Sequence, residues 1–140
     1  MKNFEICIRA IIQSKNRFLI CWHKEKNYYF FPGGHIKFGE SAKKALLREL
    51  KEELGISVKR ISFIGAVENI FTEENQKHHE LNLIFEVEPN KIKVRSGEDH
   101  IDFFLITKND FRQKKILPLA LKKSILKWLK DKKLIWASQI

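Results

Sequence analysis

Three glutamates, Glu49, Glu52 and Glu53, are the residues of this sequence whose types and spacing best suit chemistry. Steps of three and four residues place side chains on one face of a helix. Carboxylates crowded on one face repel one another, and a hard divalent cation that prefers oxygen ligands, Mg²⁺ or Mn²⁺, removes that repulsion. Because runs of charge on a helix are more often solvated surface, the residues around the glutamates decide between the two interpretations.

The surrounding residues predict a helix from Ser41 to Leu54. Ser41 is a favourable N-cap residue, and Gly55 stands where a glycine commonly ends a helix. Leucines at four-residue intervals form an apolar stripe beside the carboxylates, which should pack on a sheet. Ahead of the helix, Gly33 and Gly34 permit backbone conformations and a close approach that other residues forbid. We therefore expect a tight loop that delivers a glutamate-bearing helix to a cleft.

From Gly34 to Ile56 the sequence follows the pattern G-x5-E-x7-R-E-U-x-E-E-x-G-U, with U an aliphatic residue. The pattern resembles the Nudix box, and every fixed position is filled. The resemblance implies the Nudix fold, an α/β/α sandwich around a mixed β-sheet. It also implies an enzyme, a hydrolase that uses Mg²⁺ or Mn²⁺ to cleave the diphosphate linkage of a nucleotide.

The resemblance further implies roles for individual residues. The metal ligands are carboxylates of the box and one backbone carbonyl, namely those of Glu49, Glu52, Glu53 and Gly34. Glu98 resembles a late acidic position that supplies an additional ligand. Arg48 is expected to orient the glutamates through an ion pair, and Glu40 is expected to be structural. The general base is Glu49 or Glu53, with a loop carboxylate as the alternative.

Outside the box, four residues are candidates for substrate binding: Arg9, Lys24, Tyr29 and Glu80. Arg9 falls in an expected central strand, where a charge is costly unless it is paired or faces a site, so it suits a substrate phosphate. Lys24 suits the same role. Tyr29 belongs to an aromatic strand, one side of which can stack on a base. Glu80 is an additional candidate metal ligand or base, with plain surface charge as the alternative.

The cysteines and histidines of the sequence are assigned no catalytic or metal-binding role. Cys7 and Cys21 lie in apolar strands, where buried and unreactive thiols are expected. His35 is left without a function. His78 and His79 are interpreted as the polar edge of a loop, because adjacent residues of a strand point to opposite sides and no further zinc ligand lies at a suitable spacing.

The pattern of apolar segments predicts strands followed by one helix, further strands and then helices. The expected strands are 4–12, 17–23, 28–31, 58–70, 81–87 and 101–106, with a bulge at Gly65 and a loop over 73–79. Asn109 is expected to cap a short helix, an amphipathic helix covers about 119–133, and 134–140 packs against the body or a partner chain. This order indicates an α+β or α/β sandwich with a mixed sheet.

The length of 140 residues suits a single domain, 1–140. No apolar run approaches the ~18 residues of a membrane span, and the first residues do not resemble a signal peptide, so we expect a cytoplasmic protein. The net charge is +10, and residues 108–133 contribute ten basic and two acidic side chains. Such a segment can attract nucleic acid, but a solvated lysine face is the favoured interpretation.

Several functions remain open within this class. The substrate is a nucleoside triphosphate, a nucleotide sugar such as ADP-ribose, or a dinucleoside polyphosphate, and the short chain favours triphosphates. The alternatives are a pyrophosphohydrolase of RNA 5′ ends, suggested by the basic segment, a non-catalytic nucleotide sensor, and a basic interaction module. The chain is expected to be a monomer or a homodimer.

Overall fold

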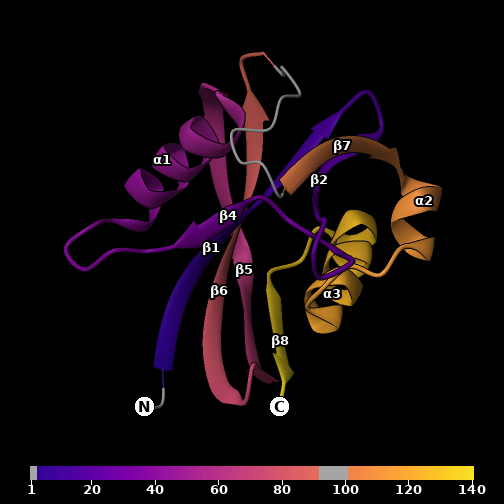
Figure 1. Ribbon diagram of the computed structural model, residues 1–140. Helices are drawn as coiled ribbons and strands as arrows, with labels where there is room; N and C mark the ends of the chain where they lie inside the picture. The colour runs from indigo at the N-terminus through magenta and orange to yellow at the C-terminus, as the bar shows by residue number, and fades with distance from the viewer. Residues whose placement is uncertain (1–2, 92–100) are drawn as a thin grey trace.

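The protein is described by a computed structural model over residues 3–91 and 101–140 (Figure 1). Within these ranges eight strands form one sheet in the order β3-β2-β1-β6-β5-β8, with β4 paired to β1 and β7 to β2. The strands are β1 (Asn3–Ser14), β2 (Arg17–His23), β3 (Tyr28–Phe30), β4 (Gly33–His35), β5 (Val58–Glu73), β6 (Gln76–Pro89), β7 (Ile101–Thr107) and β8 (Ile135–Gln139). The helices are α1 (Ala42–Leu54), α2 (Lys108–Gln113) and α3 (Leu119–Asp131).

The sheet is mixed, as predicted. Strand β1 runs parallel to β6, and β8 runs parallel to β5, whereas β5 and β6 form a long antiparallel pair. Strand β1 also pairs with β4 and, at its end, with β2. Side chains of β1 therefore lie near residues from three other strands, so β1 can bring residues from distant parts of the sequence together in one site.

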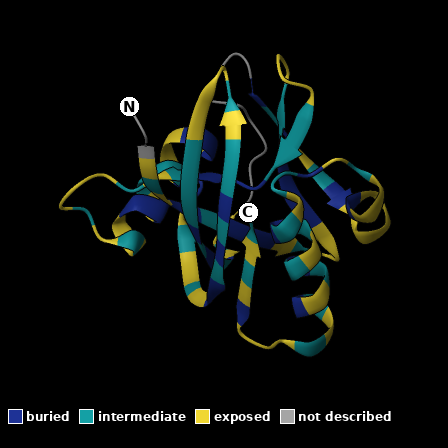
Figure 2. Cartoon of the chain, turned by 90° about the horizontal axis from the view of Figure 1, so that it is seen from below, coloured by how far each residue is buried: buried dark blue, intermediate teal, exposed yellow. Residues whose placement is uncertain are grey.

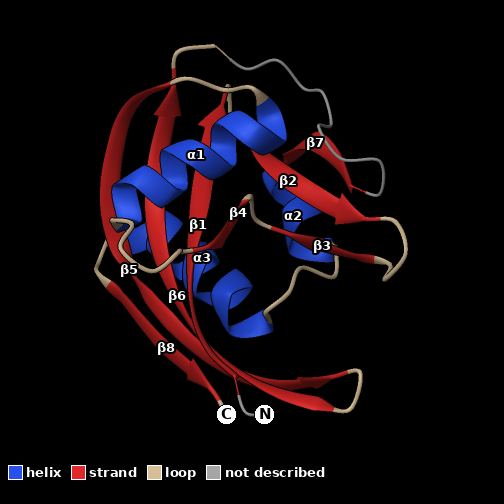
Figure 3. Ribbon diagram, turned by 60° about the vertical axis from the view of Figure 1, so that its left-hand side comes forward, coloured by secondary structure: helices blue, strands red, loops and turns tan. Residues whose placement is uncertain are grey.

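Helices cover both faces of the sheet. On one face, Leu46 and Leu50 of α1 share a buried cluster with Ile8 of β1. On the other face, Ile125 of α3 shares a cluster with Ile11 of β1. Figure 3 shows α1 lying across the strands, and Figure 2 shows buried and exposed stretches alternating along the helices, as expected for helices that pack by one side. The expected sandwich of helices and a mixed sheet is confirmed.

Helix α1 begins and ends where its residues predict. The Ser41 side chain accepts a hydrogen bond from the backbone N–H of Lys44 at 3.2 Å, which caps the first turn. Gly55 has φ 63° and its N–H is bonded to carbonyls of the last turn. This left-handed conformation is readily available to glycine, so it stops the helix directly after the last glutamate of the box.

Two sequence-based expectations about loops are wrong. Residues 73–79 are not a loop, because β5 continues to Glu73 and β6 starts at Gln76. Only Glu74 and Asn75 form the connection, with φ of 51° and 62°, and such tight turns match the twist of a hairpin. The short helix α2 is capped by the Thr107 side chain and not by Asn109. His78 and His79 consequently belong to a strand.

Other segments follow the expectations or extend them. The strand register shifts between Phe63 and Gly65, which confirms the bulge. Residues 135–139 pack against the body as β8, at the edge of the sheet (Figure 1). Strand β4 was not predicted, and it places Gly34 opposite Ile8 of β1. In the described ranges, 3–91 and 101–140, no helix has the length and apolarity needed to cross a membrane.

Candidate active site

Arg48 of α1 contacts acidic residues both on its own helix and in the loop before it. Its Nε and Nη2 atoms donate to the two Glu40 carboxylate oxygens at 2.7 and 2.9 Å, and its Nη1 atom donates to Glu49 at 2.8 Å. The same Nη1 atom lies 3.4 Å from Glu52, and Nη2 reaches the carbonyl oxygen of His35 at 3.2 Å. A two-pronged contact between guanidinium and carboxylate holds both partners in a defined geometry. Arg48 thereby fixes α1 against the loop that precedes it.

Gly34 lies directly against the carboxylate of Glu49. A Cβ atom added at Gly34 would come within 2.6 Å of the Glu49 Cδ atom, so a larger residue there would displace this carboxylate. The predicted backbone ligand and the predicted side-chain ligand are therefore neighbours. One turn further along the helix, Glu53 is buried, with 7% of its surface exposed, whereas the side chain of Glu52 is 60% exposed.

These residues fit a hard divalent cation. Arg48 is the cation that contacts Glu40, Glu49 and Glu52, and Glu53 follows Glu49 by four residues on the same helix. The surplus of negative charge and the all-oxygen donor set suit Mg²⁺ or Mn²⁺. We call Gly34, Glu49, Glu52 and Glu53 the glutamate site. The fourth proposed side-chain ligand, Glu98, lies outside the described residues.

The contacts of Arg48 shift two pKa values. Its hydrogen bonds, together with one from the backbone N–H of Lys37, lower the pKa of the Glu40 carboxyl from 4.5 to about 2. The hydrogen bond to Glu40 is also the main reason why the pKa of Arg48 is raised. Because the folded-state pKa of Glu40 is depressed, the ion pair is intact above pH 4.5 and is lost as the pH falls towards 2.

We expect Arg48→Gln to return the pKa of Glu40 towards 4.5, because the guanidinium is its strongest hydrogen-bond donor. The measurement is a pH titration of the Glu40 carboxyl carbon by NMR. Lys44→Gln is the matched control, since it makes the same charge change at an exposed position of the same helix. An unchanged Glu40 pKa in Arg48→Gln would show that the guanidinium is not the cause.

A pocket of about 490 Å³ lies on the sheet face that carries α3. Arg9 and Glu80 line it, together with aromatic and amide side chains that include Phe71, Asn69 and Gln139. Arg9 is held by Asn82 Oδ1 at 3.3 Å and by the carbonyl of Phe31 at 3.1 Å. Its charge is thus oriented within the pocket wall by neutral acceptors.

Lys24 and Tyr29, the other two candidates for substrate binding, do not line this pocket. Lys24 forms an ion pair with Asp102 at 3.2 Å on the surface. The Tyr29 ring packs on Trp22 with ring centroids 4.6 Å apart, and its hydroxyl lies 3.2 Å from Nζ of Lys114. The interpretation of Tyr29 as a packing residue is therefore the better supported one.

Sequence reasoning missed the buried amides of the pocket region. Asn82 is fully buried, and it contacts Arg9, Glu80 and the carbonyl of Val67. Asn69 is 5% exposed and lies opposite Glu80 in the β5–β6 pair. A buried amide is costly unless its polar atoms are used, and an asparagine amid apolar strand residues was the signal that could have indicated it.

The comparisons with known proteins agree with this geometry. The sequence profile of the NUDIX domain matches residues 3–129, so the chain belongs to the NUDIX domain family. It is 26% identical over 97 residues to an ADP-ribose pyrophosphatase of Methanocaldococcus jannaschii, covering 67% of this chain and 56% of that protein. It is 37% identical over 67 residues to an 8-oxo-dGTP diphosphatase of Buchnera aphidicola, covering 48% of this chain and 54% of that protein.

The chain therefore spans about half the length of these two curated relatives. Among solved structures, it resembles a mutator MutT protein of Bacillus halodurans with a TM-score of 0.80 at 18% identity. That match covers 96% of this chain and 88% of the other. At this level of identity the similarity establishes the fold.

Proposed function

We propose that the protein is a Mg²⁺- or Mn²⁺-dependent hydrolase that cleaves a phosphoanhydride bond of a nucleotide. The observation that supports this most directly is the glutamate site, where Arg48 orients Glu49 and Glu52 while Gly34 makes room for the Glu49 carboxylate. Three acidic side chains contact one guanidinium and Glu53 follows on the same helix, which leaves a surplus of negative charge. A purely structural helix gains nothing from such a surplus, whereas a cation-dependent enzyme requires it.

A bound divalent cation neutralises charge on the phosphates and makes water more acidic. The residues of the chain supply position and a proton acceptor. Glu49 accepts a hydrogen bond from Arg48 through Oε1, which engages this oxygen in an ion pair. Glu53 lies one helical turn further on and is buried. We therefore assign the general base to Glu53, which takes the proton of the attacking water.

The pocket lined by Arg9 and Glu80 is the proposed place of the nucleoside. Phe71 and Tyr28 offer aromatic faces for a base, and Asn69 and Gln139 offer amides for its polar edge. Arg9 supplies a positive charge for a phosphate. We place nucleoside triphosphates first among the substrates, with nucleotide sugars and dinucleoside polyphosphates as alternatives. Both relatives carry names that specify a nucleotide.

The contacts made by lysines of the basic segment, residues 108–133, favour free nucleotides over RNA as the substrate. Lys122 donates to the carbonyls of Arg112 and Lys114 at 2.8 and 2.7 Å, and Lys132 lies 3.7 Å above the Trp128 ring. These lysines are thus used in holding α2 and α3 in place. RNA with a 5′ triphosphate is retained as the second candidate substrate because the segment still carries most of the net charge.

A substrate panel tests the proposal. Nucleoside triphosphates, including oxidised ones, ADP-ribose, dinucleoside polyphosphates and 5′-triphosphorylated RNA are each incubated with the protein and Mg²⁺, and both products are identified. We expect cleavage between phosphates that stops when the cation is chelated. Binding of nucleotide without product would indicate a sensor and overturn the proposal. Faster turnover of RNA than of every free nucleotide would replace the first substrate class with the second.

A further inference from the structure

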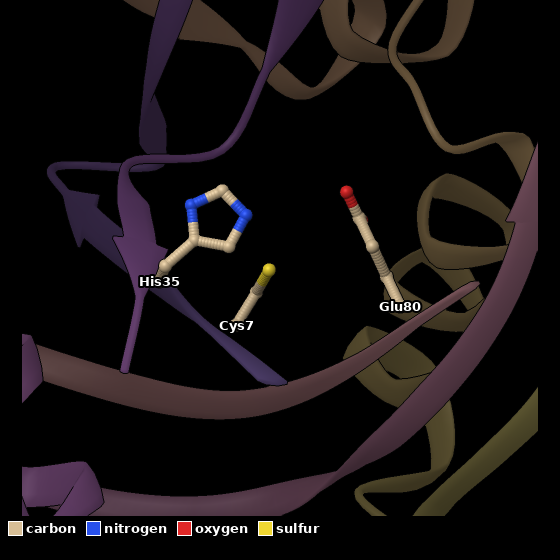
Figure 4. A group of neighbouring side chains, drawn as sticks. All are labelled: Cys7, His35 and Glu80. Carbon is tan, nitrogen blue, oxygen red and sulfur yellow. The ribbon is translucent and has the colours of Figure 1, made fainter. Parts of the chain in front are cut away.

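Cys7, His35 and Glu80 come together on the sheet, although they are far apart in the sequence. They belong to β1, β4 and β6, and strand register explains why they meet. Cys7 lies opposite both His35 and Asn82, and Glu80 precedes Asn82 by two positions, so its side chain is on the same face. One ligand atom from each of the three residues lies within 4.8 Å of the other two (Figure 4).

We propose that Cys7, His35 and Glu80 form a second metal site, which binds a borderline transition-metal ion such as Zn²⁺. A thiolate, an imidazole and a carboxylate are the ligand types that Zn²⁺ uses, whereas Mg²⁺ takes oxygen ligands. This site, which we call the Cys7 site, is separate from the glutamate site in both residues and ligand chemistry. It does not depend on the proposed hydrolase activity.

The side chains of Cys7, His35 and Glu80 differ in burial, and this difference decides which of them must move to bind a metal ion. Zinc–ligand bonds of about 2.0–2.3 Å place tetrahedral ligand atoms roughly 3.5 Å apart, so the cluster must contract by about 1 Å. Cys7 is fully buried and fixed in the sheet. The His35 side chain is 61% exposed and can rotate, and Glu80 is half-buried at the pocket wall. Closure on a metal ion therefore requires the His35 ring and the Glu80 carboxylate to move towards Cys7.

Glu5 completes the surroundings of the Cys7 site. Its Oε2 atom lies 3.3 Å from Nε2 of His35 and 3.8 Å from Nδ1 of His78. A carboxylate next to a metal-binding imidazole orients the ring or adds a ligand of its own. With Glu5 or a water molecule as the fourth donor, the set matches the usual coordination number of zinc.

Metal binding must displace a proton from the thiol. Burial is the main reason why the pKa of Cys7 is raised to about 12; the nearby Arg9 charge counteracts part of this rise, and Glu80 and Glu5 add to it, so the thiol is protonated at neutral pH. Forming the bond between Sγ and the metal breaks the S–H bond and releases one proton to the buffer. No oxidation or reduction takes part. Binding should therefore strengthen as the pH rises.

Cobalt spectroscopy tests the Cys7 site, because Co²⁺ replaces Zn²⁺ and absorbs in the near ultraviolet when bound to a thiolate. Titration of the whole chain with Co²⁺ should develop this absorption with one equivalent of metal, and Zn²⁺ should abolish it while excess Mg²⁺ does not. Cys7→Ser should eliminate the band, whereas Cys21→Ser, a change at the other buried cysteine, should retain it. A wild-type protein without the band, or a Cys7→Ser protein that retains it, would overturn the proposal.

Two further variants protect the test against misfolding and against confusion with the glutamate site. His35→Gln changes an exposed ring, so it should preserve the circular dichroism spectrum yet weaken Co²⁺ and Zn²⁺ binding at least about tenfold. The double variant Glu52→Gln, Glu53→Gln should bind Co²⁺ through the thiolate as the wild type does. Unchanged affinity in His35→Gln, or loss of the band in the double variant, would contradict a separate Cys7 site.

Discussion

Replacing Glu53 with Gln is expected to reduce turnover by about a hundredfold or more while the fold stays intact. Glutamine has nearly the same shape, so the buried position on α1 remains filled. It cannot accept the proton of the attacking water, and it offers a cation a neutral oxygen in place of a charged one. Steady-state rates on the preferred nucleotide of the panel measure the effect, and circular dichroism checks the fold.

Lys51→Gln is the matched control for this experiment. Lys51 is an exposed residue of α1 two positions before Glu53, and the change introduces the same side chain on the same helix. Its rate should remain close to that of the wild type. If Glu53→Gln also retained a near-normal rate, the general base would have to be Glu49 or a loop carboxylate, and the role assigned to Glu53 would be wrong.

Gly33→Ala is expected to destabilise the protein by at least about 3 kcal/mol, or to prevent folding. Gly33 has φ 149°, which side chains rarely adopt, and an added Cβ would lie 1.9 Å from the carbonyl oxygen of Ile8. That oxygen belongs to the backbone of β1, which cannot rotate away as a side chain can. Chemical denaturation, or the yield of folded protein, measures the effect.

Gly39→Ala provides the comparison, because Gly39 lies in the loop that follows β4 and also has a positive φ, of 82°. No atom of the described chain lies within 4 Å of a Cβ placed there, so only backbone strain of about 1–2 kcal/mol is expected. Equal losses in the two variants would mean that the contact with Ile8 is relieved by a shift of the chain.

The parts of the fold that could be predicted are those specified by neighbouring residues. The cap at Ser41 and the stop at Gly55 are local signals, and they give α1 its limits. Strand β4 could not be predicted, because Gly33 and Gly34 have low strand propensity and form a strand only through pairing with β1. The hairpin turn at Glu74 and Asn75 was missed because polar residues suggested a longer loop.

Features set by neighbouring residues could also be predicted at the two proposed sites, whereas features set by strand pairing could not. Arg48 and the glutamates lie on one helix, so their contacts follow from spacing. The neighbourhood of Cys7, His35 and Glu80 arises from the register of three strands, which no short stretch of sequence contains. The spacing of single residues also gave no means of deciding that Tyr29 would pack against Trp22 rather than face the pocket.

Strand β4 contributes His35, which has contacts on both sides of the sheet. The carbonyl of His35 receives Arg48 from the helix side, while the His35 ring stands beside Cys7 and Glu80 on the pocket side. A displacement of this single residue therefore alters its contacts on both sides of the sheet. The two proposed sites thus share one short piece of backbone at His35.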